Sequence, residues 1–418
     1  MPLELANDLL VVSPHEEPPA AAMVVRALIG ANLGTAEYTP APNRADAPAP
    51  SGPGARTRLG AYSVTIPGTQ ATGRIVVFSY TAPVTAGMSE GAFGALTRTL
   101  AAEDVHTLRE GTLALDLRVR TSETQALAAL DWAMRTLHVL LDMTQGTAID
   151  PAAQRCYNRA DLSSFTTSDA LVHITIHDEL WNAESRWLHT HGMQKFGRAE
   201  LDLVGVPISL EPEGRAFLRD VALGLAGGLA LVAGGEIDME DFGRVVAIGV
   251  PADVDHQAPY GRLRLADVPH PGELQSNSPI RLLIRMALAD VANRAAIGDT
   301  AGALDDIERV LAADPDDCAA LTAKARLYLR GGQVMEALGI GEYIELRVPH
   351  DYRGPLIVGV ALAALGRLRE ALHALERAIK REPDAAEPFA VRAGVYERLG
   401  ETQLATVDRA HADYLAHA

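Results

Sequence analysis

The chain has 418 residues, more than one ordinary hydrophobic core accommodates, so its length predicts two or three domains. Its apolar content of 48% is that of a globular protein and excludes a largely disordered chain. Of the formal net charge of −17 at pH 7, −13 falls in residues 1–279. This acidity makes nucleic acid and anionic membranes poor partners, and we expect a protein or peptide partner instead.

The cysteines and the first residues of the chain indicate the cellular compartment. Cys156 and Cys318 are the two cysteines and form no Cys-x-x-Cys pair, which excludes a disulfide framework and a thiolate zinc site. The first residues include Glu4 and Asp8 and lack a basic segment before a long apolar stretch, so we expect no secretory signal. The longest apolar run, Val221–Gly235, is shorter than the ~18–20 residues of a membrane helix, and we interpret it as a buried helix. We therefore predict a cytoplasmic location.

The first part of the chain alternates strand and helix patterns. A strand is expected at Asp8–Val12 and a helix at Pro19–Leu33, followed by an exposed loop rich in Pro and Ala at Tyr38–Arg58. Further strands are expected at Ala61–Ile66, Arg74–Tyr80 and Thr112–Val119, and helices at Glu90–Ala102 and Ser122–Leu141. This density of interleaved elements predicts an α+β region of ferredoxin-like split β-α-β layers, with one or two such units.

The α+β pattern continues to residue 252 and then changes. Strands are expected at Ala170–Ile176, Leu201–Ile208 and Arg244–Val250, and a helix at Pro212–Val232. We predict an α+β region over residues 1–252, in one or two subdomains and including the loop 38–58, a connecting segment over 253–279, and an all-α region over 280–418.

Four features recur with a period of 34 residues in the last part of the chain. They are Gly298, Gly332, Gly366 and Gly400; Ala303, Ala337, Ala371 and Ala405; Pro315, Pro349 and Pro383; and Leu304, Leu338 and Leu372. Each Gly suits a turn after a first helix, each Ala a close helix crossing, and each Pro the end of a second helix. The period is that of a two-helix repeat. This part resembles the tetratricopeptide-repeat (TPR) family and predicts a solenoid of four helical hairpins.

The resemblance implies a right-handed superhelix whose concave face is lined by the first helix of each hairpin. The concave positions are then Arg285 in the first repeat, Thr322, Arg326 and Arg330 in the second, Arg353 and Leu356 in the third, and Glu387, Glu397 and Arg398 in the fourth. Arginines outnumber glutamates among them, against the sign of the whole chain. We predict a groove for an acidic or carboxylate-ended peptide that uses Arg285, Thr322, Arg326, Arg330, Arg353 and Arg398. The ligand could also be the acidic N-terminal region of the chain itself. Solvated surface charge is the alternative interpretation.

A histidine-rich stretch, Trp187–Leu203, stands out in the α+β region. It resembles the motif His-Thr-x-Gly-Met/Leu-x-x-Phe-Gly-x-x-Glu of uncharacterised bacterial α+β domains. The segment Gly146-Thr-Ala-Ile-Asp-Pro resembles a segment of the same family, and the whole resemblance covers about residues 110–235. No activity is implied by this resemblance. A structural interpretation is that Gly192 and Gly197 allow tight backbone and that Met193 and Phe196 pack.

A metal site is the alternative interpretation of this stretch. We expect His173 and His177 on one face of one strand and His189 and His191 on one face of another, with Glu200 and Asp202 nearby. These side chains could hold zinc or iron with an open position for water, as in a metal-dependent hydrolase. We interpret Asp178 and Glu179 as the start of a helix.

Other enzyme signatures are missing from the sequence: it has no Walker loop, no dinucleotide-binding Gly-x-Gly-x-x-Gly after a strand, and no Gly-x-Ser-x-Gly elbow. We therefore predict a bacterial-type interaction adaptor without enzymatic activity or cofactor, in which an acidic α+β recognition module precedes the peptide-binding repeats. A metal-dependent hydrolase built on His173, His177, His189, His191 and Glu200 is the second hypothesis.

Overall fold

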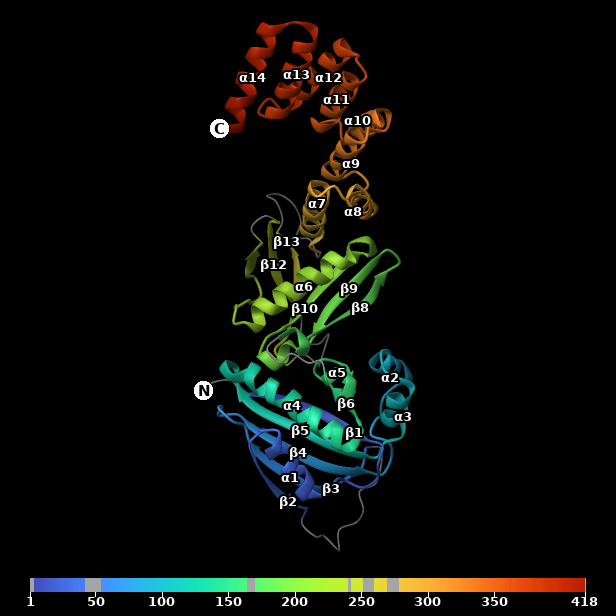
Figure 1. The fold of residues 1–418 in the computed structure, drawn as a ribbon, viewed down its shortest axis with the longest axis vertical. Coiled ribbons are helices and arrows are strands. Elements are labelled where there is room, and N and C mark those ends of the chain that lie inside the picture. Colours follow the sequence, from blue (N-terminus) through green and yellow to red (C-terminus); the bar gives the residue numbers. More distant parts are fainter. Residues whose placement is uncertain are drawn as a thin grey trace.

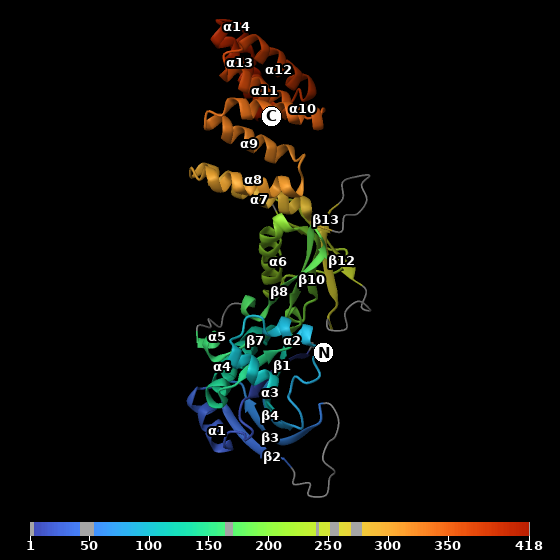
Figure 2. The same ribbon diagram turned by 90° about the vertical axis from the view of Figure 1, so that its right-hand side faces the viewer.

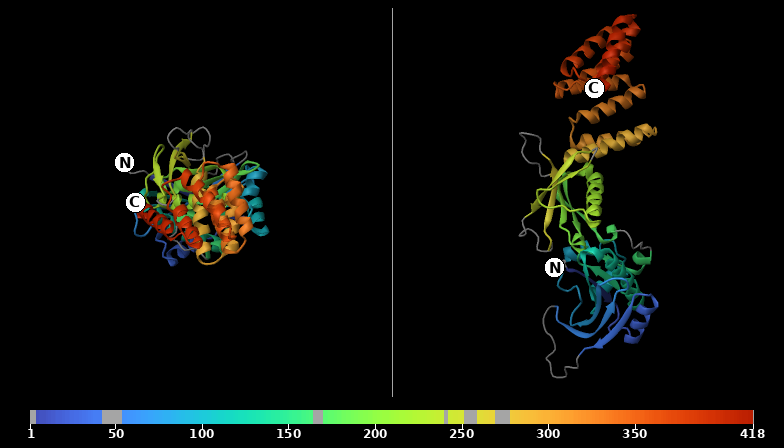
Figure 3. Two further views of the ribbon diagram at one scale, coloured as in Figure 1. Left: turned by 90° about the horizontal axis from the view of Figure 1, so that it is seen from above. Right: turned by 90° about the vertical axis from the view of Figure 1, so that its left-hand side faces the viewer.

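The structure is a computed structural model that describes residues 4–41, 54–163, 170–239, 242–250, 259–268 and 278–417. They form three parts that follow one another along the long axis of the molecule: a first sheet, a second sheet and a stack of helices (Figures 1 and 2). The right-hand view of Figure 3 shows the same succession from the side opposite to that of Figure 2, and the left-hand view looks along the long axis. In the described residues, none of the helices combines the length and the apolar character that crossing a bilayer requires.

The first sheet has seven strands in the order β2-β3-β4-β5-β1-β6-β7, with antiparallel neighbours throughout its described pairs. The strands are β1 (Glu4–Ser13), β2 (Thr35–Pro40), β3 (Arg56–Thr65), β4 (Thr72–Tyr80), β5 (Leu113–Ser122), β6 (Thr147–Asp150) and β7 (Arg155–Tyr157). Strand β1 lies between β5 and β6, which the helix α4 (Ala126–Thr144) connects. This is the arrangement of a split β-α-β unit.

Helices cover both faces of the first sheet because β1 is apolar on both sides. Leu9 and Val11 share one core with α1 (Ala21–Gly30) and α4. Val12 shares another core with Phe93 of α2 and Leu108 of α3. The helices α2 (Glu90–Thr97) and α3 (Ala102–Glu110) replace the single predicted helix at 90–102. The chain turns between them, so that both helices contribute to the same core.

The predicted loop 38–58 is shorter than expected at both ends. Strand β2 extends to Pro40 and β3 begins at Arg56. Tyr38 pairs with Tyr62 across the two strands, with ring centroids 5.0 Å apart, and such aromatic cross-strand pairs stabilise a sheet. Residues 42–53 of the loop lie outside the described residues.

The second sheet has six strands in the order β11-β12-β13-β10-β9-β8. They are β8 (Thr175–Asn182), β9 (Ser185–His191), β10 (Glu200–Pro207), β11 (Glu236–Asp238), β12 (Arg244–Val250) and β13 (Arg262–Asp267). Strands β10 and β13 are parallel neighbours, and the helix α6 (Glu211–Ala226) packs its Phe217 against Leu203 and Leu265 in one core. Two short elements, η1 (Glu123–Gln125) and α5 (Arg159–Ser163), contact α4 of the first part, and three others, η2 (Ala170–His173), η3 (Met193–Phe196) and η4 (Ile208–Leu210), contact α6.

Three expectations for the second sheet are corrected. The segment expected to connect, 253–279, contains β13, which pairs with both β10 and β12 inside the sheet. The expected strand Ala170–Ile176 is the short helix η2 followed by β8, so Asp178 and Glu179 lie in a strand and not at a helix start. The apolar run 221–235 is not one buried helix, because α6 ends at Ala226, just before Gly227 and Gly228, and Val232 is 70% exposed.

The third part is a TPR-like stack of four helical hairpins. The hairpins are α7 (Ile280–Ala296) with α8 (Thr300–Ala313), α9 (Cys318–Arg330) with α10 (Val334–Arg347), α11 (Arg353–Ala364) with α12 (Leu368–Arg381), and α13 (Ala386–Leu399) with α14 (Thr402–His417). We call α7, α9, α11 and α13 the A helices and the others the B helices.

The periodic residues have the roles that their spacing predicts. The four glycines after the A helices have φ between +78° and +84°, a region that favours glycine. The four alanines early in the B helices are at most 1% exposed. The B helices α8, α10 and α12 end two residues before a proline, and the residue between is non-helical in each case, as the residue preceding a proline prefers.

The stack is continuous with the second sheet. One core cluster contains Leu203 and Leu265 of the sheet, Leu283 of α7 and Ile307 of α8. Arg309 of α8 also forms an ion pair with the buried Glu213 of α6, with 2.7 Å between Nη1 and Oε1. The first hairpin is therefore covered on one side by the α+β region, as the end of a repeat stack requires.

Candidate functional site

The A helices form the inner layer of the stack. Each A helix contacts the next one, α7 with α9, α9 with α11, and α11 with α13. In a curved stack the helices that approach one another across repeats line the concave face. The predicted groove positions all lie on these four helices.

Arg326 and Arg330 are exposed on the A helix α9, one helical turn apart. The Arg326 guanidinium contacts Glu387 at the start of α13, two repeats away, and its Nη2 donates to both carboxylate oxygens at 2.7 and 2.6 Å. The two side chains are 51% and 45% exposed. The structure thus brings together two of the groove residues that the sequence pointed to.

The other predicted groove residues serve the stack itself. Thr322 is buried, and its hydroxyl donates to the Cys318 carbonyl at 2.6 Å. Arg353 binds the carboxylate of Asp351, two residues earlier, at the start of α11. Arg398 donates from Nη1 to the Ala363 carbonyl in the last turn of α11, at 2.5 Å. The Arg398 contact satisfies a carbonyl at the end of α11 and joins two neighbouring repeats, whereas the contacts of Thr322 and Arg353 are local in the chain.

Arg285 points to the second sheet and not along the groove. Its Nη1 donates to the Phe242 carbonyl at 3.0 Å, in the turn between β11 and β12. Gly243, next to this carbonyl, has φ +101°, a region that favours glycine. Arg285 therefore holds the first hairpin to the α+β region.

Three of the four candidate metal-binding histidines lie on one face of the β8–β9 hairpin. His177 is directly opposite His189 in the ladder, and His191 follows two residues later on the same face. The ring centroids are separated by 4.8 to 5.8 Å, and the Trp187 ring stacks on His189 at 4.3 Å. Sequence spacing placed His189 and His191 correctly because period-two alternation is a local property of a strand.

His173 is separate from this group, which corrects the expectation that it shares a strand face with His177. It lies in η2, fully buried, and its ring meets the edge of Phe196. Burial and the neighbouring Lys195 lower its pKa to about 3, so the ring is neutral. Among the residues that the structure describes, no set of three or more His, Cys, Asp and Glu side chains is arranged to hold a metal ion. The metal-dependent hydrolase stays a prediction from the sequence.

Glu200 organises the turn that follows the histidines. It accepts hydrogen bonds from the Thr190 hydroxyl at 2.7 Å and from the Gly192 amide at 3.0 Å. Burial raises its pKa to about 7 although these hydrogen bonds favour the ionised form. Gly192 has φ +108°, and a Cβ there would lie 2.2 Å from the His173 carbonyl oxygen. Met193 and Phe196 are buried in the core, so most of the motif has the structural role that we considered.

A buried ion pair joins the two stretches that resemble the uncharacterised domains. Lys195 of η3 pairs with Asp150 at the end of β6, and the two residues are 2% and 0% exposed. Lys195 Nζ also donates to the His173 carbonyl at 3.3 Å, and Asp150 accepts from the Ala153 amide at 3.1 Å. The pair connects the first sheet to the second. Sequence reasoning missed it because 45 residues separate the partners.

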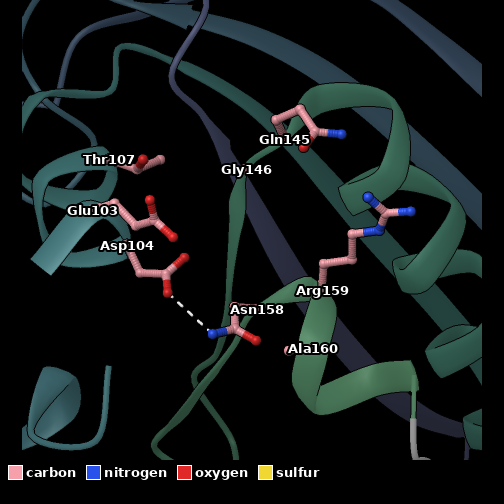
Figure 4. Close-up of a pocket in the computed structure, with 8 residues that line it drawn as sticks. All are labelled: Glu103, Asp104, Thr107, Gln145, Gly146, Asn158, Arg159 and Ala160. Atoms are coloured by element: carbon pink, nitrogen blue, oxygen red, sulfur yellow. Dashed lines mark hydrogen bonds between the residues drawn. The ribbon is translucent and has the colours of Figure 1, made fainter. Parts of the chain in front are cut away.

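A polar pocket of about 580 Å³ opens on the first sheet between α3, the α4–β6 turn and α5. Figure 4 shows the carboxylates of Glu103 and Asp104 on one wall and Asn158 on another. Asp104 accepts from Asn158 Nδ2 at 3.0 Å and from the Thr147 hydroxyl at 2.9 Å. Arg159, at the rim, is paired with Asp142 outside the pocket. The two carboxylates make the lining rich in hydrogen-bond acceptors, and among the lining residues Gly146 belongs to a segment that stood out in the sequence, Gly146-Thr-Ala-Ile-Asp-Pro.

Comparisons with known proteins concern the helical repeats. No family model matches the chain, and no curated protein matches it. TTC0263, a thermophilic TPR protein in Thermus thermophilus, is 30% identical over 32% of this chain and 74% of that chain, with a TM-score of 0.30. MamA is 22% identical over 30% of this chain and 73% of that chain, with a TM-score of 0.26. MamA from Desulfovibrio magneticus RS-1 is 21% identical over 33% and 76%, with a TM-score of 0.27. The resemblance of residues 110–235 to uncharacterised domains stays a prediction.

Proposed function

We propose that the chain is an interaction adaptor that holds an acidic or carboxylate-ended peptide of a protein partner in the concave groove of its TPR-like stack. The single observation that carries the proposal is the position of Arg326 and Arg330, which expose two guanidinium groups on the same A helix of an inner layer. A guanidinium binds carboxylate with charge-assisted, bidentate hydrogen bonds. Arg326 already binds a carboxylate, that of Glu387.

The groove that we propose uses fewer binding residues than the sequence predicted. Arg398 joins two repeats, Arg353 is paired with the neighbouring Asp351, and Arg285 contacts the second sheet, so these three side chains already have partners outside the proposed groove. The binding residues that we propose are therefore Arg326 and Arg330. Val360, 34 residues after Arg326 on the next A helix, is partly buried against a core of the stack, and in the groove that we propose its exposed part would contact the peptide.

The partner that we propose is a separate polypeptide. Within one chain the first sheet lies at the opposite end of the molecule from α13 and α14, and the second sheet contacts the first hairpin (Figure 1). The α+β region would then recognise a second partner or respond to a signal, which makes the chain an adaptor. A cytoplasmic location fits Cys156 and Cys318, which are buried and form no disulfide.

Binding of a labelled acidic peptide tests the proposal. We expect the change of Arg326 and Arg330 together to Gln to weaken, by about tenfold, the binding of a fluorescein-labelled peptide of alternating Glu and Ser, measured by anisotropy on the full chain. Binding to the unchanged chain should also fall as salt rises, because ions screen exposed charges over ~8 Å at physiological salt.

The matched control is Arg369→Gln, which removes one exposed cation from the B helix α12. This change should leave the affinity as it is. Binding that is indifferent to both arginines and to salt would place the ligand outside the groove, and the proposal would be abandoned.

A further inference from the structure

Glu387 occupies the place where a ligand carboxylate would bind. Both of its carboxylate oxygens contact a single nitrogen of Arg326, Nη2, at 2.7 and 2.6 Å. A guanidinium binds a carboxylate with two parallel N–H bonds through one of two edges, Nε with Nη2 or Nη1 with Nη2. Nη2 belongs to both edges. A carboxylate on Nη2 therefore blocks each bidentate mode of Arg326.

The contact spans the groove and is not a local helix pair. Arg326 belongs to α9 and Glu387 to α13, and 61 residues separate them in the chain. Between them runs α11, which carries no charged side chain after Arg353. Because α11 offers no carboxylate between them, Arg326 pairs with Glu387 of the following A helix, α13.

The ion pair is open to exchange. The two side chains are 51% and 45% exposed, and pairs of that exposure contribute little to stability because water and ions compete with them. A ligand carboxylate can take the place of Glu387 without uncovering a buried charge. Arg330, one turn further along α9, would remain available to the same ligand.

We propose that Glu387 is a built-in competitor that sets how acidic a peptide must be to enter the groove. This inference rests on the proposed function, since it concerns the same groove. A peptide with one carboxylate only exchanges one ion pair of Arg326 for another and leaves Glu387 unpaired. A peptide with several carboxylates also reaches Arg330 and gains contacts beyond the exchange. Glu387 is thus a specificity-determining residue for acidic peptides.

The test compares Glu387→Gln, Arg326→Gln and the double variant in the full chain. The probes are two fluorescein-labelled peptides, one of alternating Glu and Ser and one with Gln in place of each Glu, with binding followed by anisotropy. We expect Glu387→Gln to bind the acidic peptide about two- to fivefold more tightly and to leave binding of the Gln peptide unchanged. The gain should vanish in the Arg326→Gln background, because the competitor acts only through Arg326.

The control for charge alone is Glu376→Gln, which removes a carboxylate from the B helix α12 that is 53% exposed, against 45% for Glu387. Thermal melting followed by circular dichroism verifies that each variant is folded. If Arg326→Gln weakens binding while Glu387→Gln leaves it unchanged or weakens it, the competitor role is refuted and the groove stands. If Arg326→Gln has no effect on acidic-peptide binding, the groove and the competitor are both refuted. An equal gain from Glu376→Gln would reduce the effect to net charge and also refute the inference.

Discussion

The buried pair of Lys195 and Asp150 gives the sharpest stability prediction. In Lys195→Met the apolar side chain keeps most of the volume, but the Asp150 carboxylate is left at 0% exposure with the neutral Ala153 amide as a donor and without its cation. Breaking a buried pair from one side costs about 3–5 kcal/mol, because an uncompensated charge stays in a low-dielectric site. This is a large fraction of the roughly 5–15 kcal/mol by which domains are stable.

Removing both charges should restore much of the loss. In Lys195→Met with Asp150→Asn, the amide oxygen can still accept from Ala153 and no buried charge remains, so we expect at least about 2 kcal/mol to return. The exposed pair of Arg120 and Asp8 in the same sheet, 34% and 49% exposed, is the matched control. Arg120→Met should cost less than about 1 kcal/mol.

Urea unfolding followed by tryptophan fluorescence measures these differences in the relevant part of the chain. The three tryptophans, Trp132, Trp181 and Trp187, all lie in the α+β region, on both sides of the buried pair. The signal therefore reports the two sheets and not the helical stack. The reasoning is refuted if Lys195→Met costs no more than Arg120→Met, or if the double variant is no more stable than the single one.

Two further predictions concern the stack and the turn at Glu200. Ala371 is 0% exposed at a helix crossing, so Ala371→Trp should destabilise the stack by about 1–3 kcal/mol or more in thermal melts. The surface change Glu376→Gln should alter stability by less than about 0.5 kcal/mol. If Glu376→Gln were the more destabilising of the two, the repeat register would be wrong. The pKa of Glu200 is raised from 4.5 to about 7, so between these pH values the folded state holds a proton that the unfolded state releases. The stability that this proton contributes is fully present below pH 4.5 and is lost as the pH rises through 7. Glu200→Gln does not titrate, and its stability relative to the unchanged chain should rise between pH 4.5 and 7 by up to about 3 kcal/mol; a difference that is flat across this window would contradict the assignment.

The sequence by itself determined the features that depend on neighbouring residues. The 34-residue period placed the turn glycines, the crossing alanines and the helix-ending prolines, because backbone conformation and helix packing at these positions are set within one hairpin. It also predicted that His189 and His191 share a face, since side-chain alternation is a property of the strand itself.

Tertiary structure decided where a short segment meets distant ones. Residues 170–182 read as a strand followed by a helix, but pairing of β8 with β9 extends the strand through Asp178 and Glu179 and leaves His173 in η2. The polar, Pro-rich composition of residues 253–279 predicts connecting chain, but β13 within it pairs with β10, some 60 residues earlier, and with β12.

In the groove, too, the sequence determines the position of each side chain on its helix, and the tertiary structure determines its partner. Sequence spacing assigned Arg326, Arg353 and Arg398 to the same concave surface, yet what each guanidinium binds depends on groups that the fold brings close. Arg353 meets Asp351, Arg398 meets a carbonyl of α11, and Arg326 meets Glu387 from two repeats away. Helical periodicity determines which face a residue occupies, but the partner of a long charged side chain is decided by the superhelix, because an ion pair depends on separation in space and not in sequence.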